Sequence, residues 1–113
     1  MLGQGPLSQM PDASRPSPPF GTLVRIERLM FAAKVRAARA VLGWKQSELG
    51  KRAGLTQKSI HRIEQGTDDL RRSTVIIVGR VLKAEGVEFE DLPDGGFKVV
   101  VPKAVLAKNE PVV

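Results

Sequence analysis

The sequence predicts a mainly α-helical domain of four to five helices that ends in a small β-hairpin. Apolar residues recur every three or four positions through much of the chain, and glycines stand where helices would end. After residue 86, short runs of β-branched and aromatic residues flank a turn-rich stretch. A chain of 113 residues has room for a single core, because domains usually run to about 100–150 residues.

The amino-terminal segment differs in composition from the rest of the chain. Residues 1–21 contain five prolines among glycine, serine and glutamine. Few apolar side chains are present to offset the entropy that is lost when a chain becomes ordered. We therefore expect a disordered, proline-rich tail at residues 1–21.

The first helical segment is predicted from Thr22 to Leu42, as one long helix or two consecutive helices. It contains no proline, and Val35, Ala38 and Leu42 recur at helical spacing. Gly43 is expected to end it, because a residue without Cβ can enter the left-handed region of backbone conformation.

Two short helices are predicted next, over residues 46–53 and 57–65. Only three residues separate them, which favours a sharp crossing rather than antiparallel packing. Thr56 can cap the second helix, because its hydroxyl can accept from backbone N–H groups of the first turn. The apolar anchors expected in this region are Trp44, Leu49, Ile60 and Ile63.

A last helix, over residues 73–85, is apolar on more than one side. Its expected core residues are Val75, Val78 and Leu82. Its remaining apolar side chains are Ile76, Ile77 and Val81. We expect a second copy of the chain to cover this surplus; the alternative is that the isoleucines pack beneath the first helix of their own subunit.

Two short strands are predicted at residues 87–89 and 97–101, joined by a turn over residues 91–96. The predicted division is a tail over 1–21, a helical domain over 22–86, a hairpin or dimerisation extension over 87–102 and a flexible tail over 103–113.

Composition excludes several classes of function. The chain has no cysteine, and His61 is the single histidine, so we expect no disulfide, metal site or cofactor. No nucleophile–histidine–carboxylate arrangement or phosphate-binding glycine loop is recognisable, so we expect no enzymatic activity. No apolar run approaches the ~18–20 residues that cross a bilayer, and no secretory signal is evident. We expect a cytoplasmic protein.

Positive charge is concentrated in the helical part of the chain. Residues 23–85 carry 14 basic and six acidic side chains, a net charge of +8, whereas residues 86–113 have a net charge of −2. A local excess of this kind suits a polyanion, because each basic side chain that meets a phosphate releases counterions. A solvated helical face would have the same charge, so the charge alone leaves both interpretations open.

A set of short signals runs in fixed order through the two short helices. They are Gln46-x-x-Leu49, Gly54-Leu55, Ser59-Ile60 and Glu64-x-Gly66. In this order and spacing the chain resembles, over about residues 34–89, the lambda-repressor-like (Xre) family of helix-turn-helix DNA-binding regulators. The resemblance implies that the second short helix enters the major groove of double-stranded DNA.

The exposed face of that second helix carries side chains that can read bases. Glutamine can pair with N6 and N7 of adenine, and arginine can bind O6 and N7 of guanine. The resemblance implies base contacts by Gln57, Lys58 and Arg62. Further candidates for DNA contact are Ser59 and His61. Phosphate contacts are expected at Lys45, Gln46 and Arg72.

The resemblance also implies a structural salt bridge between Arg39 and Glu64. One departure is Gly50, which stands where the family most often has alanine at a close helix–helix contact. Gly50 and Gly79 should each cost about 1 kcal/mol of helix propensity.

Three functions are compatible with these features. The leading hypothesis is a sequence-specific transcriptional regulator of the repressor type, acting as a homodimer on two half-sites. The second is an antitoxin that uses the same DNA-binding domain and neutralises a partner toxin. The third is an interaction module that no longer binds DNA, which the basic and amide side chains of the exposed face disfavour.

Overall fold

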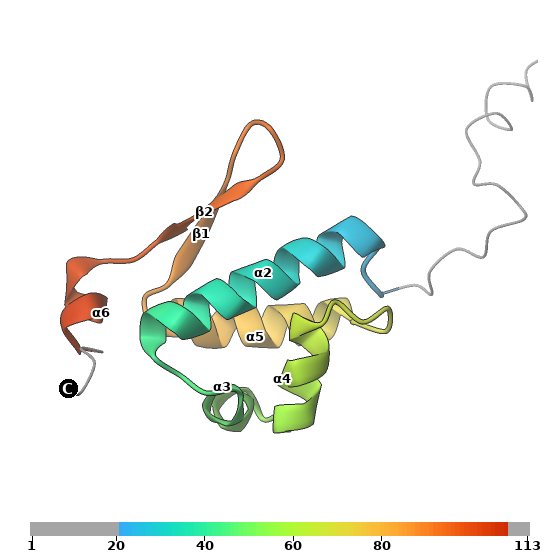
Figure 1. Cartoon of the computed structure of the whole chain (residues 1–113), viewed down its shortest axis with the longest axis horizontal. Coiled ribbons are helices and arrows are strands. Elements are labelled where there is room, and N and C mark those ends of the chain that lie inside the picture. Colours follow the sequence, from blue (N-terminus) through green and yellow to red (C-terminus); the bar gives the residue numbers. More distant parts are fainter. Residues whose placement is uncertain (1–20, 109–113) are drawn as a thin grey trace, which may run out of the picture.

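The computed structural model describes residues 21–108. Apart from Gly21, the predicted proline-rich tail lies outside these residues, as do residues 109–113 of the predicted carboxy-terminal tail. Five helices and one hairpin make up the described chain, so the predicted fold class is confirmed (Figure 1). In chain order they are α2 (Arg25–Leu42), α3 (Gln46–Ala53), α4 (Gln57–Glu64), α5 (Arg72–Ala84), β1 (Glu88–Asp91), β2 (Phe97–Val100) and α6 (Lys103–Lys108).

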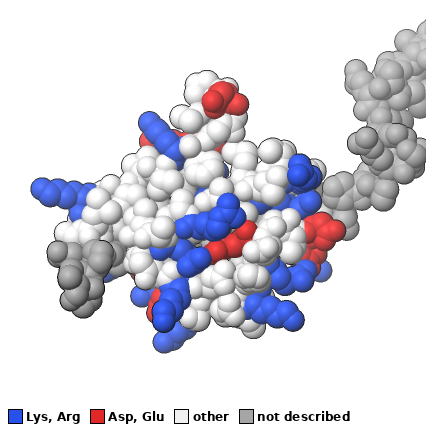
Figure 2. Space-filling view, in the orientation of Figure 1, with Lys and Arg blue, Asp and Glu red and all other residues white. Residues whose placement is uncertain are grey.

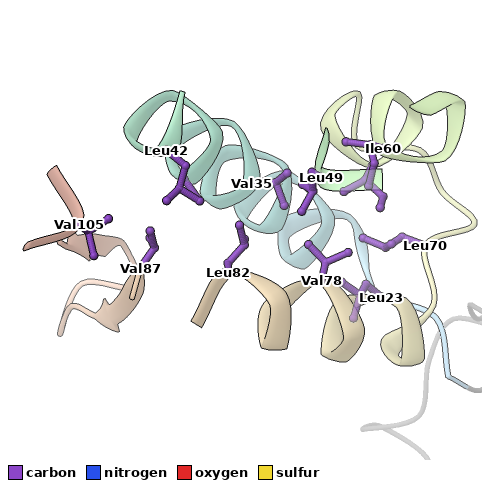
Figure 3. Packing of buried hydrophobic residues seen from close by; sticks show 12 residues of the cluster. Leu23, Val35, Leu42, Leu49, Ile60, Leu70, Val78, Leu82, Val87 and Val105 are labelled. Atoms are coloured by element: carbon purple, nitrogen blue, oxygen red, sulfur yellow. The ribbon is translucent and has the colours of Figure 1, made fainter. Parts of the chain in front are cut away.

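The first predicted helical segment is a single helix, α2, and the core lies between it and α5. Val35 of α2, Leu49 of α3, Ile60 of α4 and Val78 of α5 are each fully buried and belong to one cluster (Figure 3). The apolar faces of α3, α4 and α5 therefore converge on the middle of α2, as the helical spacing predicts. This packing fixes α3 and α4 relative to the rest of the molecule.

The segment before α2 is tied to the loop that follows α4. The Leu23 N–H donates to the Leu70 carbonyl at 3.0 Å, and Thr22 pairs with Arg71 in an isolated β-bridge. Leu23 and Leu70 are both buried in the core cluster. The loop after α4 is therefore held at its far end by backbone and by apolar contacts.

Gly50 lies where α3 passes closest to the turn that follows it. A Cβ at this position would stand 2.8 Å from the carbonyl oxygen of Leu55, which is closer than Cβ atoms approach an oxygen. The turn also donates its Leu55 N–H to the Gly50 carbonyl at 2.7 Å. Glycine at this position thus permits a backbone contact that alanine would obstruct.

The hairpin packs one of its faces on α2. β1 and β2 are antiparallel, with Phe89 opposite Val99, and the rings of Phe89 and Phe97 meet edge to face at 6.0 Å. The ammonium group of Lys34 lies 5.6 and 5.4 Å from the centres of these two rings. Cation–π contacts and the partly buried rings hold the hairpin against the helix.

The structure differs from the prediction at the carboxy-terminal end. Residues 103–108, expected to be flexible, form α6, and the buried Val105 joins the core cluster beside Val87. A segment this short has little helical signal of its own, so its conformation depends on tertiary contacts, namely the burial of Val105 and the ion pair of Lys108 with Glu85 at 3.3 Å. The hairpin and α6 thus contribute to the same core as the helices.

Two predictions about α5 have different outcomes. Val81, predicted to point away from the core, packs against it. Ile76 and Ile77 are 52% and 42% exposed, so neither is covered by α2 of its own subunit. The apolar surplus on α5 is therefore smaller than predicted, but it is open to solvent.

Candidate nucleic-acid interface

The turn between α3 and α4 sets the angle between the two short helices. Gly54 ends α3 with φ of 70°, a left-handed conformation in which a side chain would be strained. Thr56 then caps α4, because its Oγ1 accepts the backbone N–H of Ser59 at 3.0 Å. Ile60 and Ile63 are buried on the inner side of α4. The other side of α4 is left facing solvent.

The outward side of α4 carries the predicted base-contacting residues. The side chains of Gln57, Lys58, His61 and Arg62 are all exposed. Within residues 21–108, neither Lys58 nor His61 makes a side-chain hydrogen bond or ion pair. Figure 2 shows Lys and Arg side chains around the lower end of the molecule, where α3 and α4 lie.

Ser59 occupies a different position from these four residues. It is half-buried, and its Oγ accepts a hydrogen bond from Thr56 Oγ1 at 2.9 Å. Its side chain therefore belongs to the cap of α4 in the free protein.

Gln57 is joined to the start of α3. Its Nε2 donates to Oε1 of Gln46 at 2.7 Å, and Nε2 of Gln46 donates to Oε1 of Glu64 at 3.2 Å. A carboxylate can only accept, so Gln46 must turn its NH₂ group toward Glu64 and its oxygen toward Gln57. The predicted base reader and the predicted phosphate contact are thus parts of one hydrogen-bonded chain.

The chain of hydrogen bonds ends on a buried ion pair. Nε and Nη2 of Arg39 lie 2.6 and 2.8 Å from the two carboxylate oxygens of Glu64, a bidentate arrangement. The Glu64 side chain is 4% exposed and that of Arg39 is 22% exposed. Arg39 also donates to the carbonyl of Trp44 at 2.8 Å, so it ties α2, the loop before α3 and α4 together.

Both members of the pair have shifted pKa values. Burial by itself would raise the pKa of Glu64, but hydrogen bonds from Arg39 and Gln46 outweigh burial and hold the pKa below its ordinary value. The hydrogen bond to Glu64 raises the pKa of Arg39. The pair is charged at neutral pH.

The predicted phosphate contacts lie at helix amino termini. Lys45 is exposed and precedes the first residue of α3, where the helix dipole favours an anion. Arg72, the first residue of α5, pairs with Glu27 of α2 at 3.3 Å. Its neighbour Arg71, which was not among the predicted residues, lines a hollow beside Arg62.

One contact of a predicted base reader could not be found from the sequence. Nη2 of Arg62 lies 2.8 Å from Oδ2 of Asp69, which belongs to the loop after α4. The helix ends at Glu64, between the two residues, so helical spacing does not apply to them and only the course of the loop reveals the pair. Asp69 is therefore a further member of this surface.

Other kinds of site have no support among the described residues. No group of three or more His, Cys, Asp or Glu side chains there could hold a metal ion. None of the described helices has the length and apolar character that a membrane span requires.

Comparison with known families agrees with this geometry. A family model described as a helix-turn-helix domain matches residues 30–92, more than half of the chain. No curated protein and no solved structure matches the chain. The chain belongs to the helix-turn-helix domain family, which is consistent with its resemblance to the lambda-repressor-like regulators and indicates a DNA-binding regulator.

Proposed function

We propose that this protein is a sequence-specific, double-stranded DNA-binding regulator of the repressor type, acting in the cytoplasm. In this proposal α4 lies in the major groove, with Gln57, Lys58 and Arg62 on base edges and His61 as a further contact. The single observation that carries the proposal is the exposed outer face of α4, whose amide and basic side chains stand on a helix fixed by Ile60 and the Arg39–Glu64 pair.

Phosphate contacts are proposed at the helix amino termini beside α4. Lys45 and Gln46 stand at the start of α3, and Arg71 and Arg72 at the start of α5. Positive side chains and the positive end of the helix dipole favour phosphate oxygens at such ends, although the N–H of Arg72 itself donates to the carbonyl of Gly21 at 2.6 Å. These contacts would fix the register of α4 on the duplex without reading sequence.

A homodimer is part of the proposal. Ile76 and Ile77 are exposed apolar side chains of α5, and covering them with a second copy would remove apolar surface from water. A two-fold dimer would present two copies of α4 to half-sites about one helical turn apart, roughly 34–36 Å. Repression then follows if the dimer occupies a site that the transcription machinery requires.

The test compares two charge reversals of the same kind. Lys58→Glu changes the outer face of α4, whereas Lys103→Glu changes an exposed lysine on α6, outside the proposed surface. Affinity for duplex DNA would be measured by fluorescence anisotropy across a range of salt concentrations. Wild-type affinity should fall steeply, with a slope of about 0.9 in log affinity against log salt for each phosphate contacted.

Lys58→Glu should weaken binding at least about tenfold, since it replaces an attraction by a repulsion at the DNA surface. Lys103→Glu should change affinity far less, because Lys103 lies on α6, outside the proposed contacts, and would act only through long-range electrostatics that salt screens. Equal losses in the two variants, or a wild-type affinity that does not depend on salt, would refute the proposal.

A further inference from the structure

Arg62 and Asp69 form an ion pair at the edge of the proposed DNA-binding surface. Their side chains are 48% and 65% exposed, so solvent screens the pair and its contribution to folding stability is small. Stability therefore does not account for this ion pair. Because Arg62 faces the proposed DNA site, we consider a role for the pair in DNA binding.

The loop that presents Asp69 is fixed at both ends. At its start, the N–H and the Oγ1 of Thr67 both donate to the carbonyl of Arg62, at 3.3 and 3.2 Å. At its end, Leu70 is buried and its carbonyl accepts the N–H of Leu23. Asp69 lies between these two attachments. The position of its carboxylate beside α4 is therefore fixed by the loop.

The carboxylate occupies only part of the guanidinium. Asp69 takes one N–H of Nη2, and the remaining N–H groups of Arg62 have no partner among residues 21–108. A guanidinium carries five N–H donors in a planar fork, so a pair of parallel donors is still free. Arg62 can therefore keep its bond to Asp69 while it donates two hydrogen bonds to another group.

Guanine and phosphate differ in how well they fit an arginine that is held in this way. Guanine offers two acceptors, O6 and N7, on one edge, and they accept from two parallel N–H donors. Phosphate carries a full negative charge, which would lie close to the carboxylate of Asp69 and be repelled by it. The pair thus favours a neutral base edge over the sugar–phosphate backbone.

We propose that Asp69 is a specificity-determining residue that orients Arg62 toward guanine and opposes its use as a general phosphate contact. This inference rests on the proposed function, because it requires α4 to lie in the major groove. Without Asp69, Arg62 could swing to any nearby phosphate, and binding would become tighter on random DNA and less selective at one base pair.

The chain contains a matched control for this role. Asp68 precedes Asp69, carries the same charge and is exposed, but makes no hydrogen bond or ion pair within the described residues. Asp69→Asn and Asp68→Asn each remove one negative charge from the same loop. They differ in the contacts that Asp69 makes with Arg62 and with Thr67, so any difference between them reports on this local arrangement and not on net charge.

The experiment uses the full chain and duplexes selected from a randomised pool by the wild-type protein. The base pair read by Arg62 is identified as the one at which selectivity is lost in Arg62→Ala. Affinity is then measured for the selected duplex, for the same duplex with that base pair changed, and for a random duplex. Circular dichroism of each variant checks that the helices are retained.

Asp68→Asn should raise affinity for all three duplexes by similar factors, because it changes only long-range electrostatics. Asp69→Asn should raise affinity for the random duplex more than for the selected one. It should also lower the preference for guanine at the Arg62 position by about fivefold or more, part of the discrimination that a bidentate arginine contact supplies. The preferences at other base pairs should be unchanged.

Two results would be negative, and they can be told apart. If wild-type protein selects sites but Asp69→Asn behaves as Asp68→Asn does, the inference is wrong and the proposed function stands. If wild-type protein selects no site, the proposed function itself is wrong and the inference falls with it.

Discussion

At the scale of single residues, Glu64 connects the core to the proposed DNA-binding surface. Its carboxylate receives Arg39 and Gln46, and its backbone carbonyl receives Arg36 at 2.8 Å. Through Gln46 the same carboxylate determines which way the amide of Gln57 turns. A side chain that is 4% exposed thus affects both the position of α4 and the orientation of a side chain on its outer face.

Replacing this carboxylate should destabilise the protein. Glu64→Gln removes the charge partner of Arg39 and should lower the free energy of unfolding at pH 7 by about 2–4 kcal/mol. The measurement is denaturant unfolding followed by circular dichroism. Glu48→Gln is the matched control, because Glu48 is about 40% exposed and pairs with Arg52 on the surface; it should cost well under 1 kcal/mol. Similar losses in both variants would contradict this account of Glu64.

The same variant has a predicted pH dependence. The pKa of Glu64 is lowered in the folded state, so the stability it contributes is present above its unfolded value of about 4.3 and is lost as pH falls through the folded pKa. The contribution of Glu64 to wild-type stability should therefore be lost as pH falls below about 4.3, and Glu64→Gln should flatten this part of the profile. An unchanged pH profile in the variant would mean that the pKa of Glu64 is not lowered in the folded protein.

At the scale of elements, the crossing of α3 and α4 depends on how closely α3 approaches the turn after it. Gly50 allows this approach, but a glycine inside a helix lowers the helix propensity of α3. Gly79, inside α5, has the same cost without the same reason, since a Cβ there would have nothing within 4 Å. Both glycines lie inside a helix between an apolar and a basic residue, yet of the two only Gly50 is required by a close backbone contact.

Alanine substitutions should separate these roles. Gly79→Ala should raise the free energy of unfolding by about 0.5–1 kcal/mol, because helix propensity improves and no contact is obstructed. Gly50→Ala gains the same propensity but forces a Cβ against the Leu55 carbonyl, and an overpacking cost of about 1–3 kcal/mol should exceed the gain. Thermal unfolding of both variants would test this. An increase in stability for Gly50→Ala would show that α3 and the turn can move apart to accommodate the Cβ at little cost in free energy.

Elements with strong local signals could be predicted from the sequence, and those held by distant contacts could not. The bounds of α3 follow from Gly54 and the apolar pattern, because both act within a few residues. By contrast, α6 depends on burial of Val105 against residues far away in the chain. The Arg62–Asp69 pair depends in the same way on where Leu70 anchors the loop. The partner of Glu64 was predictable only through the family resemblance, since 25 residues separate it from Arg39.

At the scale of the whole molecule, the proposed DNA contacts and the proposed dimer contacts are centred on different parts of the chain. The proposed DNA contacts belong to α3, α4 and the start of α5, whereas Ile76 and Ile77 lie further along α5. The outer face of α4 can therefore bind DNA while the part of α5 beyond its first turn binds a second copy of the chain. This separation is what a two-fold dimer on two half-sites requires.

Dimerisation can be tested by a charge placed on α5. Ile77→Glu should convert a wild-type dimer to a monomer at micromolar concentration, because a carboxylate would have to be buried in the interface. Ile26→Glu is the control, since Ile26 is an isoleucine of α2 that is 62% exposed and lies outside the proposed interface. Sedimentation equilibrium would report the mass of each. A monomeric wild type, or a dimeric Ile77→Glu, would exclude α5 from self-association.

The central claim, that α4 reads the sequence of duplex DNA, is tested most directly by selecting bound duplexes from a randomised pool with the purified protein. The account predicts enrichment of one two-fold symmetric consensus, with half-site centres about 10–10.5 base pairs apart and with guanine and adenine positions that become unselective in Arg62→Ala and Gln57→Ala, respectively. A pool that shows no enriched sequence after repeated rounds, or a consensus unaffected by both substitutions, would contradict it.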